Sequence, residues 1–232
     1  MMSIERATAL HDLFNMVALP LLCVLNAVNW ASDIALWAAL EPTRYSSWRN
    51  MWIGGHQSLF LAATGVYICL DIAFLAAVPK CVKSSTTVLA HHTVVLVCLL
   101  VPYLRPTTHG YALGLCMTIE ANTTLLIARR LLMSIEFPGK ALVRAVVSTL
   151  FYATWIGIRL VLYPWLAVVV FPRDYLDAAA RDGSYVNVVL AMPTLCVLLT
   201  GLNGWWSVGL WRSFAKRMLG PAEMGHFKQH FL

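Results

Sequence analysis

Charged residues are scarce in this chain of 232 residues. Only 12% of its residues are Asp, Glu, Lys or Arg, about half of the usual share, whereas 59% are hydrophobic. A soluble protein of this length covers its surface with charge, so the composition excludes a soluble domain, a disordered chain, a nucleic-acid-binding module and a secreted disulfide scaffold. The mean hydropathy is +0.70. We interpret the chain as an all-α, polytopic membrane protein that binds no nucleic acid.

Metal-binding and disulfide motifs are also missing. The six cysteines form no C-x-x-C or C-x-x-H pair, and most of them lie within apolar runs. A free cysteine in such surroundings behaves as a small hydrophobic residue, so we expect no metal site and no bound cofactor. A secretory signal peptide is not expected either, because the apolar run after Asp12 continues beyond the 7–15 residues of a signal core.

Six apolar stretches have about the length that a helix needs to cross a bilayer, which is roughly 20 residues. Pro, Gly and charged residues separate them, and they cover residues 13–32, 53–78, 86–104, 110–127, 145–171 and 186–211. The chain has no internal repeat, no low-complexity tract and no strand-like alternation. We therefore predict one transmembrane domain over residues 13–212, with short segments outside the membrane at residues 1–12 and 213–232.

Basic residues predict the orientation of these spans. Six crossings place both termini on one side, which then carries eleven of the 17 Lys and Arg residues, whereas the opposite side carries five. The positive-inside rule places the termini in the cytosol, or in the matrix if the protein is mitochondrial. We expect a multi-pass protein of the endoplasmic reticulum or another endomembrane, with the mitochondrial inner membrane as the alternative.

Several polar residues lie at one depth inside the predicted spans, where an ionisable group costs roughly 2.5–3.5 kcal/mol on insertion scales. Asp71, Glu120 and Asn203 each lie nine residues before a basic residue, and His92 lies nine residues after Lys83. At 1.5 Å per helical residue, each is about 13–14 Å from the basic end of its span. This coincidence predicts a common polar cavity in the cytosolic half of the bilayer.

Other polar residues share these helix faces. Tyr67 lies four residues before Asp71, and Thr124 lies four residues after Glu120. Arg159 is a further charged residue inside a span. An acidic side chain facing Arg159 would form a buried ion pair that fixes helix packing, so a structural role stays open beside a cavity that receives a polar ligand.

A series of short motifs resembles one family of membrane proteins. The chain carries, in order, W-R-N at 48–50, H-Q-S at 56–58, G-V-Y at 65–67 followed by Asp71, the pair His91-His92, Glu120 with Asn122, F-Y-A-T-W-I-G-I-R-L-V-L-Y-P at 151–164 and L-N-G-W-W at 202–206. This order, over residues 45–217, resembles the TLC-domain family of TRAM, Lag and CLN proteins, and most closely its small TLC-domain-containing branch. These are proteins of lipid metabolism with six to eight membrane spans, and they include the ceramide synthases.

The resemblance to the ceramide synthases implies a site for acyl transfer. Those enzymes use a histidine pair and nearby aspartates to move a fatty acyl group from coenzyme A to a sphingoid amine, and the matching residues here are His91, His92 and Asp71. The synthases also carry a His-Asp pair and a further Asp in the following span, where this chain has only Glu120. The small branch is associated with lipid composition and membrane fluidity.

Three functions remain open at this point. An enzyme would use acyl-coenzyme A as its co-substrate, with the nucleotide phosphates near Lys80, Lys83, Arg129 and Arg130. A binding protein would hold a membrane lipid, with Arg159 pairing a phosphate or a carboxylate. A third possibility is an accessory subunit of a larger membrane complex or a homo-oligomer. The residues predicted to contact the lipid or substrate are Tyr67, Glu120, Asn122, Thr124, Arg159, Asn203 and Trp206.

Overall fold

The described part of the chain is helical and forms a bundle of six long helical stretches. The computed structural model describes residues 3–40, 54–82 and 84–231. The prediction of an all-α bundle with about six transmembrane helices is confirmed, and the protein is an integral, multi-pass membrane protein. The six helical stretches that are long and apolar enough to cross a membrane are Ile4–Trp30, Gln57–Ala77, Ser85–Leu104, Tyr111–Ser134, Lys140–Asp182 and Val188–Arg212.

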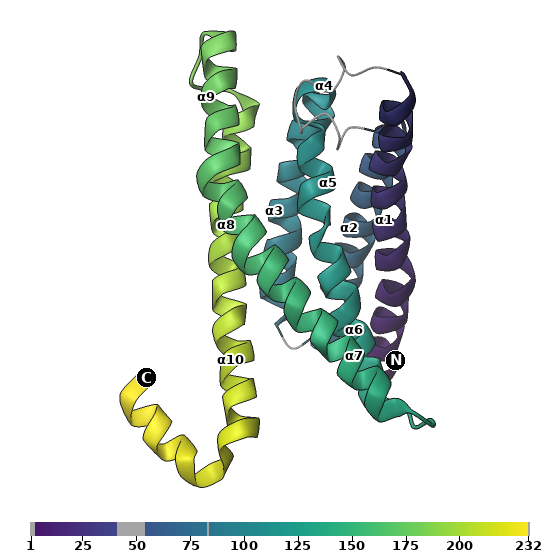
Figure 1. Cartoon of the computed structure of the whole chain (residues 1–232), viewed down its shortest axis with the longest axis vertical. Coiled ribbons are helices and arrows are strands. Elements are labelled where there is room, and N and C mark those ends of the chain that lie inside the picture. Colours follow the sequence, from purple (N-terminus) through teal and green to yellow (C-terminus); the bar gives the residue numbers. More distant parts are fainter. Residues whose placement is uncertain (1–2, 41–53, 83, 232) are drawn as a thin grey trace.

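Successive crossings run in alternating directions, so the first helix begins and the last helix ends at the same end of the bundle (Figure 1). The short helix α4 lies at the opposite end (Figure 1). The elements are α1 (Ile4–Leu40), α2 (Gln57–Ala77), η2 (Pro79–Cys81), α3 (Ser85–Leu104), α4 (Pro106–His109), α5 (Tyr111–Met117), α6 (Ile119–Ser134), α7 (Lys140–Thr154), η3 (Trp155–Leu162), α8 (Tyr163–Trp165), η4 (Leu166–Val170), α9 (Phe171–Asp182), η5 (Val188–Leu190) and α10 (Ala191–Phe231).

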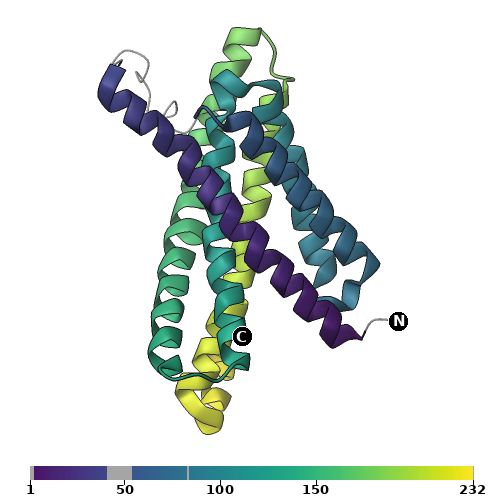
Figure 2. The same ribbon diagram turned by 90° about the vertical axis from the view of Figure 1, so that its right-hand side faces the viewer.

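The first helix begins earlier than the hydropathy of the sequence indicates. α1 starts at Ile4, so most of the segment that was expected outside the membrane, residues 1–12, forms the first turns of this helix. His11 and Asp12 are buried, and α1 packs against α2 and α6. Figure 2 shows α1 crossing the bundle obliquely. A charged residue normally marks the end of a span because lipid does not solvate it, but these two side chains have partners inside the protein.

The fifth crossing is one continuous helix, from α7 to α9, with widened turns in its middle. Pro164 has no N–H to donate, and its ring clashes with the carbonyl group four residues back. The flanking segments η3 and η4 are π-helical, and the Tyr163 N–H donates to the carbonyl of Ile158, five residues back. Such turns are frequent at functional sites. The helix continues past Phe171, the predicted end of this span, and stops before Gly183, whose φ of 64° favours glycine.

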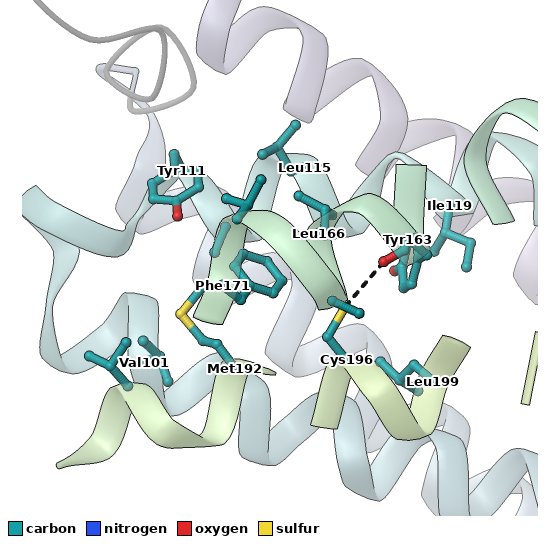
Figure 3. Packing of buried hydrophobic residues seen from close by; sticks show 14 of the residues in the cluster. Val101, Tyr111, Leu115, Ile119, Tyr163, Leu166, Phe171, Met192, Cys196 and Leu199 are labelled. Carbon is teal, nitrogen blue, oxygen red and sulfur yellow. Dashed lines mark hydrogen bonds between the residues drawn. The ribbon is translucent and has the colours of Figure 1, made fainter. Parts of the chain in front are cut away.

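An apolar cluster joins the third, fourth, fifth and sixth crossings (Figure 3). The Tyr163 hydroxyl donates to the Cys116 carbonyl at 2.8 Å, and the Cys196 thiol donates to the Tyr163 carbonyl at 3.8 Å. Phe171 and Met192 pack in the same cluster. Because lipid tails are as apolar as these side chains, the cluster stabilises the bundle through close packing and hydrogen bonds rather than through the hydrophobic effect.

The alternating crossings lead to a prediction about topology. Single cysteines at Ser84 and Thr108, introduced into a variant without native cysteines, are expected to react with an impermeant thiol reagent from opposite sides of the membrane. Both residues are exposed, and they lie in connections at opposite ends of the bundle. The positive-inside rule assigns Ser84 to the cytosolic or matrix side. Labelling of both positions from the same side would contradict the arrangement of six spans.

Candidate functional site

A cavity of about 640 Å³ lies among α2, α3, α6, α7, η3 and α10. It reaches from the His91-His92 pair to Ser84 and Arg212, which lie near the basic end of the bundle. Its volume is in the range of about 300–1,000 Å³ that is usual for small-molecule sites. Most of the other wall residues are aromatic or apolar, and the aromatic ones are Tyr67, Phe151, Trp155, Trp205 and Trp206.

Arg159, on the wall of this cavity, is only 5% exposed. Its Nε donates to Oδ1 of Asn122 at 2.8 Å, and Nη1 donates to Oδ1 of Asn203 at 2.8 Å. Nη2 donates to the Thr123 hydroxyl at 3.3 Å. Among the described residues, no carboxylate oxygen lies within 4 Å of the guanidinium. The ion pair that the sequence left open is therefore absent from this part of the chain, and neutral groups hold the buried cation.

Two indole rings complete the surroundings of this cation. The Arg159 Cζ atom lies 4.7 Å from the ring centroid of Trp155 and 5.6 Å from that of Trp206. Such contacts are worth up to about 2 kcal/mol when they are desolvated. The Trp155 Nε1–H donates to the Ser207 hydroxyl at 2.9 Å, which fixes the ring. The His91 ring packs edge to face against the Trp206 indole, with centroids 5.7 Å apart.

Asp71 connects two histidines from different helices. Its Oδ1 lies 2.8 Å from Nε2 of His11, and its Oδ2 lies 3.1 Å from Nδ1 of His92. Asp71 is 1% exposed and is not a wall residue of the cavity, whereas His92 is. This 3.1 Å contact is an ion-pair distance, and the His92 Nδ1 makes no hydrogen bond among the described residues. A carboxylate this close stabilises the protonated form of the His92 ring, which suits an acid or base.

His91 has a different environment from its neighbour. It lies on the cavity wall, and its Nδ1 is buried without a hydrogen-bond partner among the described residues. Its ring centroid lies 5.5 Å from that of His92. Neither Nδ1 of the pair makes a hydrogen bond among the described residues, but that of His92 lies 3.1 Å from a carboxylate oxygen, whereas no ion pair is present at His91.

The comparison with known families agrees with this arrangement. The family model of the TLC domain (TRAM/LAG1/CLN8) matches residues 13–212. The chain belongs to the TLC-domain family. The resemblance inferred from the motifs is confirmed, and a lipid-related role is supported at the level of the family. Every residue of the cavity wall lies inside the TLC domain. No curated protein and no solved structure matches the chain.

The predicted lipid contacts of this TLC-domain protein divide into two groups. Tyr67, Glu120, Arg159 and Trp206 lie on the cavity wall. Asn122 and Asn203 are 0% and 2% exposed and face Arg159 instead. The Thr124 hydroxyl donates to the backbone carbonyl of Glu120 at 2.8 Å, and its neighbour Thr123 lies on the wall.

Basic residues predicted to hold the phosphates of an acyl donor are less well placed. Lys83 lies outside the described residues, and Lys80, Arg129 and Arg130 are absent from the wall. Arg129 donates to the Ser148 hydroxyl at 3.1 Å, and Arg130 forms an ion pair with Asp12. Arg212 lies on the wall near the same end.

Two polar residues of α1 were missed by the sequence analysis. His11 binds Asp71, and Asn15 accepts a hydrogen bond from the Tyr67 hydroxyl at 2.7 Å. His11 lies before the matched domain and Asn15 near its beginning. A signal does exist, because Asn26 and Asn29 are buried on the same helix. Polar residues at 11, 15, 26 and 29 recur at spacings that keep them near one helix face.

Proposed function

We propose that the protein binds one molecule of a membrane lipid or a lipid-derived amphiphile in the cavity. The acyl chain packs on the aromatic and apolar wall, and the polar end lies at the level of His91, Glu120 and Arg159. The observation that carries this proposal is a cavity of about 640 Å³ that combines these two kinds of wall within a TLC domain. Ligand pockets in general are mostly apolar, with a few polar groups that fix the orientation.

Electrostatics supports a polar end for the ligand. Glu120 and Arg159 lie on the same wall, yet no ion pair within 4 Å joins them to each other or to another described residue. A charge at membrane depth without a directly contacting ion-pair partner is costly. A ligand whose polar groups contact these side chains would reduce that cost, and the neighbouring Arg212 and Ser84 mark the end from which it would enter.

A matched pair of variants tests whether the cavity holds lipid. Val208→Trp places a large side chain on the cavity wall. Val197→Trp makes the same change on the same helix, and the two native side chains are similarly exposed, Val208 at 47% and Val197 at 54%. The eleven residues between them correspond to a rotation of about 20°, so the two valines share one helix face at different depths. Val197 is not among the wall residues.

Native mass spectrometry of gently purified protein is expected to find one bound lipid in the wild type and in Val197→Trp. Val208→Trp is expected to bind it about tenfold more weakly or worse, because overpacking costs typically 1–3 kcal/mol. A wild-type protein free of lipid, or equal retention by both variants, would contradict binding in this cavity.

A second candidate function is transfer of an acyl group, and the contact between His92 and Asp71 favours it. In this reaction an amine nitrogen attacks the carbonyl carbon of an acyl-coenzyme A thioester, and the carbon–sulfur bond breaks. His92 takes the proton from the amine and returns it to the departing thiolate, so the products are an amide and free coenzyme A. Such general acid–base help requires an imidazole that is held in place.

A further inference from the structure

Arg159 has hydrogen-bonding capacity that the described protein does not use. A guanidinium carries five N–H groups, and three of them donate to Asn122, Asn203 and Thr123. One N–H on each terminal nitrogen is left, on a side chain that is 5% exposed and lies on the cavity wall. The planar fork of arginine binds carboxylate and phosphate oxygens with strong, charge-assisted hydrogen bonds.

A second, independent observation lies beside this cation. The buried Nδ1 of His91 has no hydrogen-bond partner among the described residues. The His91 ring and the Arg159 guanidinium contact the same indole, that of Trp206, at 5.7 and 5.6 Å. Buried polar groups are nearly always hydrogen-bonded. The unused nitrogen of His91 and the unused N–H groups of Arg159 therefore lie on one cavity wall, on side chains that contact the same indole, and lack a partner among the described residues.

We infer that the occupant of the cavity is a single-chain amphiphile with one negative charge, a carboxylate or a phosphodiester, bound by Arg159 and His91. This inference rests on the proposed lipid binding and adds the chemical class of the ligand. The acidic Glu120 on the same wall disfavours a second negative charge, and it accepts a hydrogen bond from any hydroxyl, amide or ammonium group on the ligand.

The test compares ligands that share one saturated hydrocarbon chain of nearly the same length and differ in the head group. Purified full-length protein in detergent is titrated with palmitate, with the neutral 1-hexadecanol and with 1-palmitoyl lysophosphatidylcholine, each in competition with a fluorescent fatty acid. Palmitate or the lysophospholipid is expected to bind at least about tenfold more tightly than hexadecanol, because a negatively charged oxygen accepts stronger hydrogen bonds from a guanidinium than a neutral hydroxyl does. Palmitate as the tighter ligand identifies a carboxylate, and the lysophospholipid as the tighter ligand identifies a phosphodiester.

Two variants link the preference to the named residues. Arg159→Gln is expected to reduce the affinity for the anionic ligand to that for hexadecanol. His91→Phe keeps a ring on Trp206 and leaves the bonds of Arg159 intact, and it is expected to weaken anion binding severalfold. If Arg159→Gln does not fold, the ligand series on the wild type and His91→Phe still decide the matter.

The outcomes separate this inference from the proposed function. Equal affinity for palmitate, lysophosphatidylcholine and hexadecanol overturns the anion site while lipid binding in the cavity stands. A lack of binding by all three overturns both. An anion preference that survives Arg159→Gln and His91→Phe assigns the anion to another site and overturns the inference.

Discussion

Replacing Asn122 by leucine is expected to lower the free energy of unfolding by about 1–3 kcal/mol, the usual cost of leaving a buried polar group without its partner. The Asn122 side chain is fully buried. Its Oδ1 accepts from Nε of Arg159 at 2.8 Å, and its Nδ2 donates to the Phe151 carbonyl and the Thr154 hydroxyl at 3.0 Å each. Leucine fills the same space but leaves the guanidinium with one acceptor fewer. Unfolding of the purified protein, followed by circular dichroism during titration with a denaturing detergent, measures the change.

Thr124→Val is the matched control for this variant. It removes from the same helix a hydroxyl that donates to a backbone carbonyl of its own turn and is not one of the groups that accept from Arg159, so the stability is expected to change little. The double variant Asn122→Leu/Arg159→Leu is expected to be less destabilised than the sum of the single variants, because the leucine at 122 then faces no unpaired charge. Additive losses would show that the two side chains are not coupled.

Hydropathy predicted the number of crossings, and helix geometry predicted that polar side chains from different spans lie near one another. Both depend on properties that are local in sequence, namely the length of an apolar run and a rise of 1.5 Å per residue. His91, His92 and Glu120 do lie on one cavity wall with Arg159. The rotation of each helix about its own axis, which decides the side chains that face the cavity, did not follow from the sequence. It depends on which neighbouring helices pack against each face.

Errors in phase explain the misplaced contacts. Thr123, and not Thr124, lies on the wall, since one residue turns a helix by about 100°. Asn122 and Asn203 face the buried arginine, because a desolvated cation is costly unless acceptor groups form hydrogen bonds with it. The turns around Pro164 also change the phase of the fifth crossing, and no periodicity of 3.6 residues reproduces them.

Long-range pairing explains what the sequence did not show at the first helix. His11 and Asp71 are sixty residues apart in the chain, and Asp12 and Arg130 are almost twice as far apart. Each residue taken alone indicates the end of an apolar span. Only the packing of α1 against α2 and α6 shows that these charges have partners and belong inside the bundle.

Under the acyl-transfer function, His92→Ala is the variant expected to have the largest effect, which is a loss of reaction rate. Loss of general acid–base help lowers rates by about 10²–10⁴-fold. His92 is the imidazole of the pair that lies beside the Asp71 carboxylate, with 3.1 Å between Nδ1 and Oδ2. His91 contacts Trp206 instead. His92→Ala is therefore expected to lower kcat, and His91→Phe is expected mainly to raise KM by weakening the hold on the ligand.

Release of free coenzyme A by protein reconstituted in liposomes, with palmitoyl-coenzyme A and a panel of amine acceptors, measures these constants. Asp71→Asn is expected to fall between wild type and His92→Ala, because it keeps the shape of the side chain but loses the charge that stabilises the imidazolium. Equal losses in kcat from His91→Phe and His92→Ala would contradict the division of roles.

Under the binding function, His92→Ala keeps the lipid that native mass spectrometry finds in the wild type, since the bonds of Arg159 to Asn122, Asn203 and Thr123 do not involve His92. Retained lipid in His92→Ala together with lost turnover would separate the roles of these two residues, with Arg159 holding the ligand and His92 acting on it.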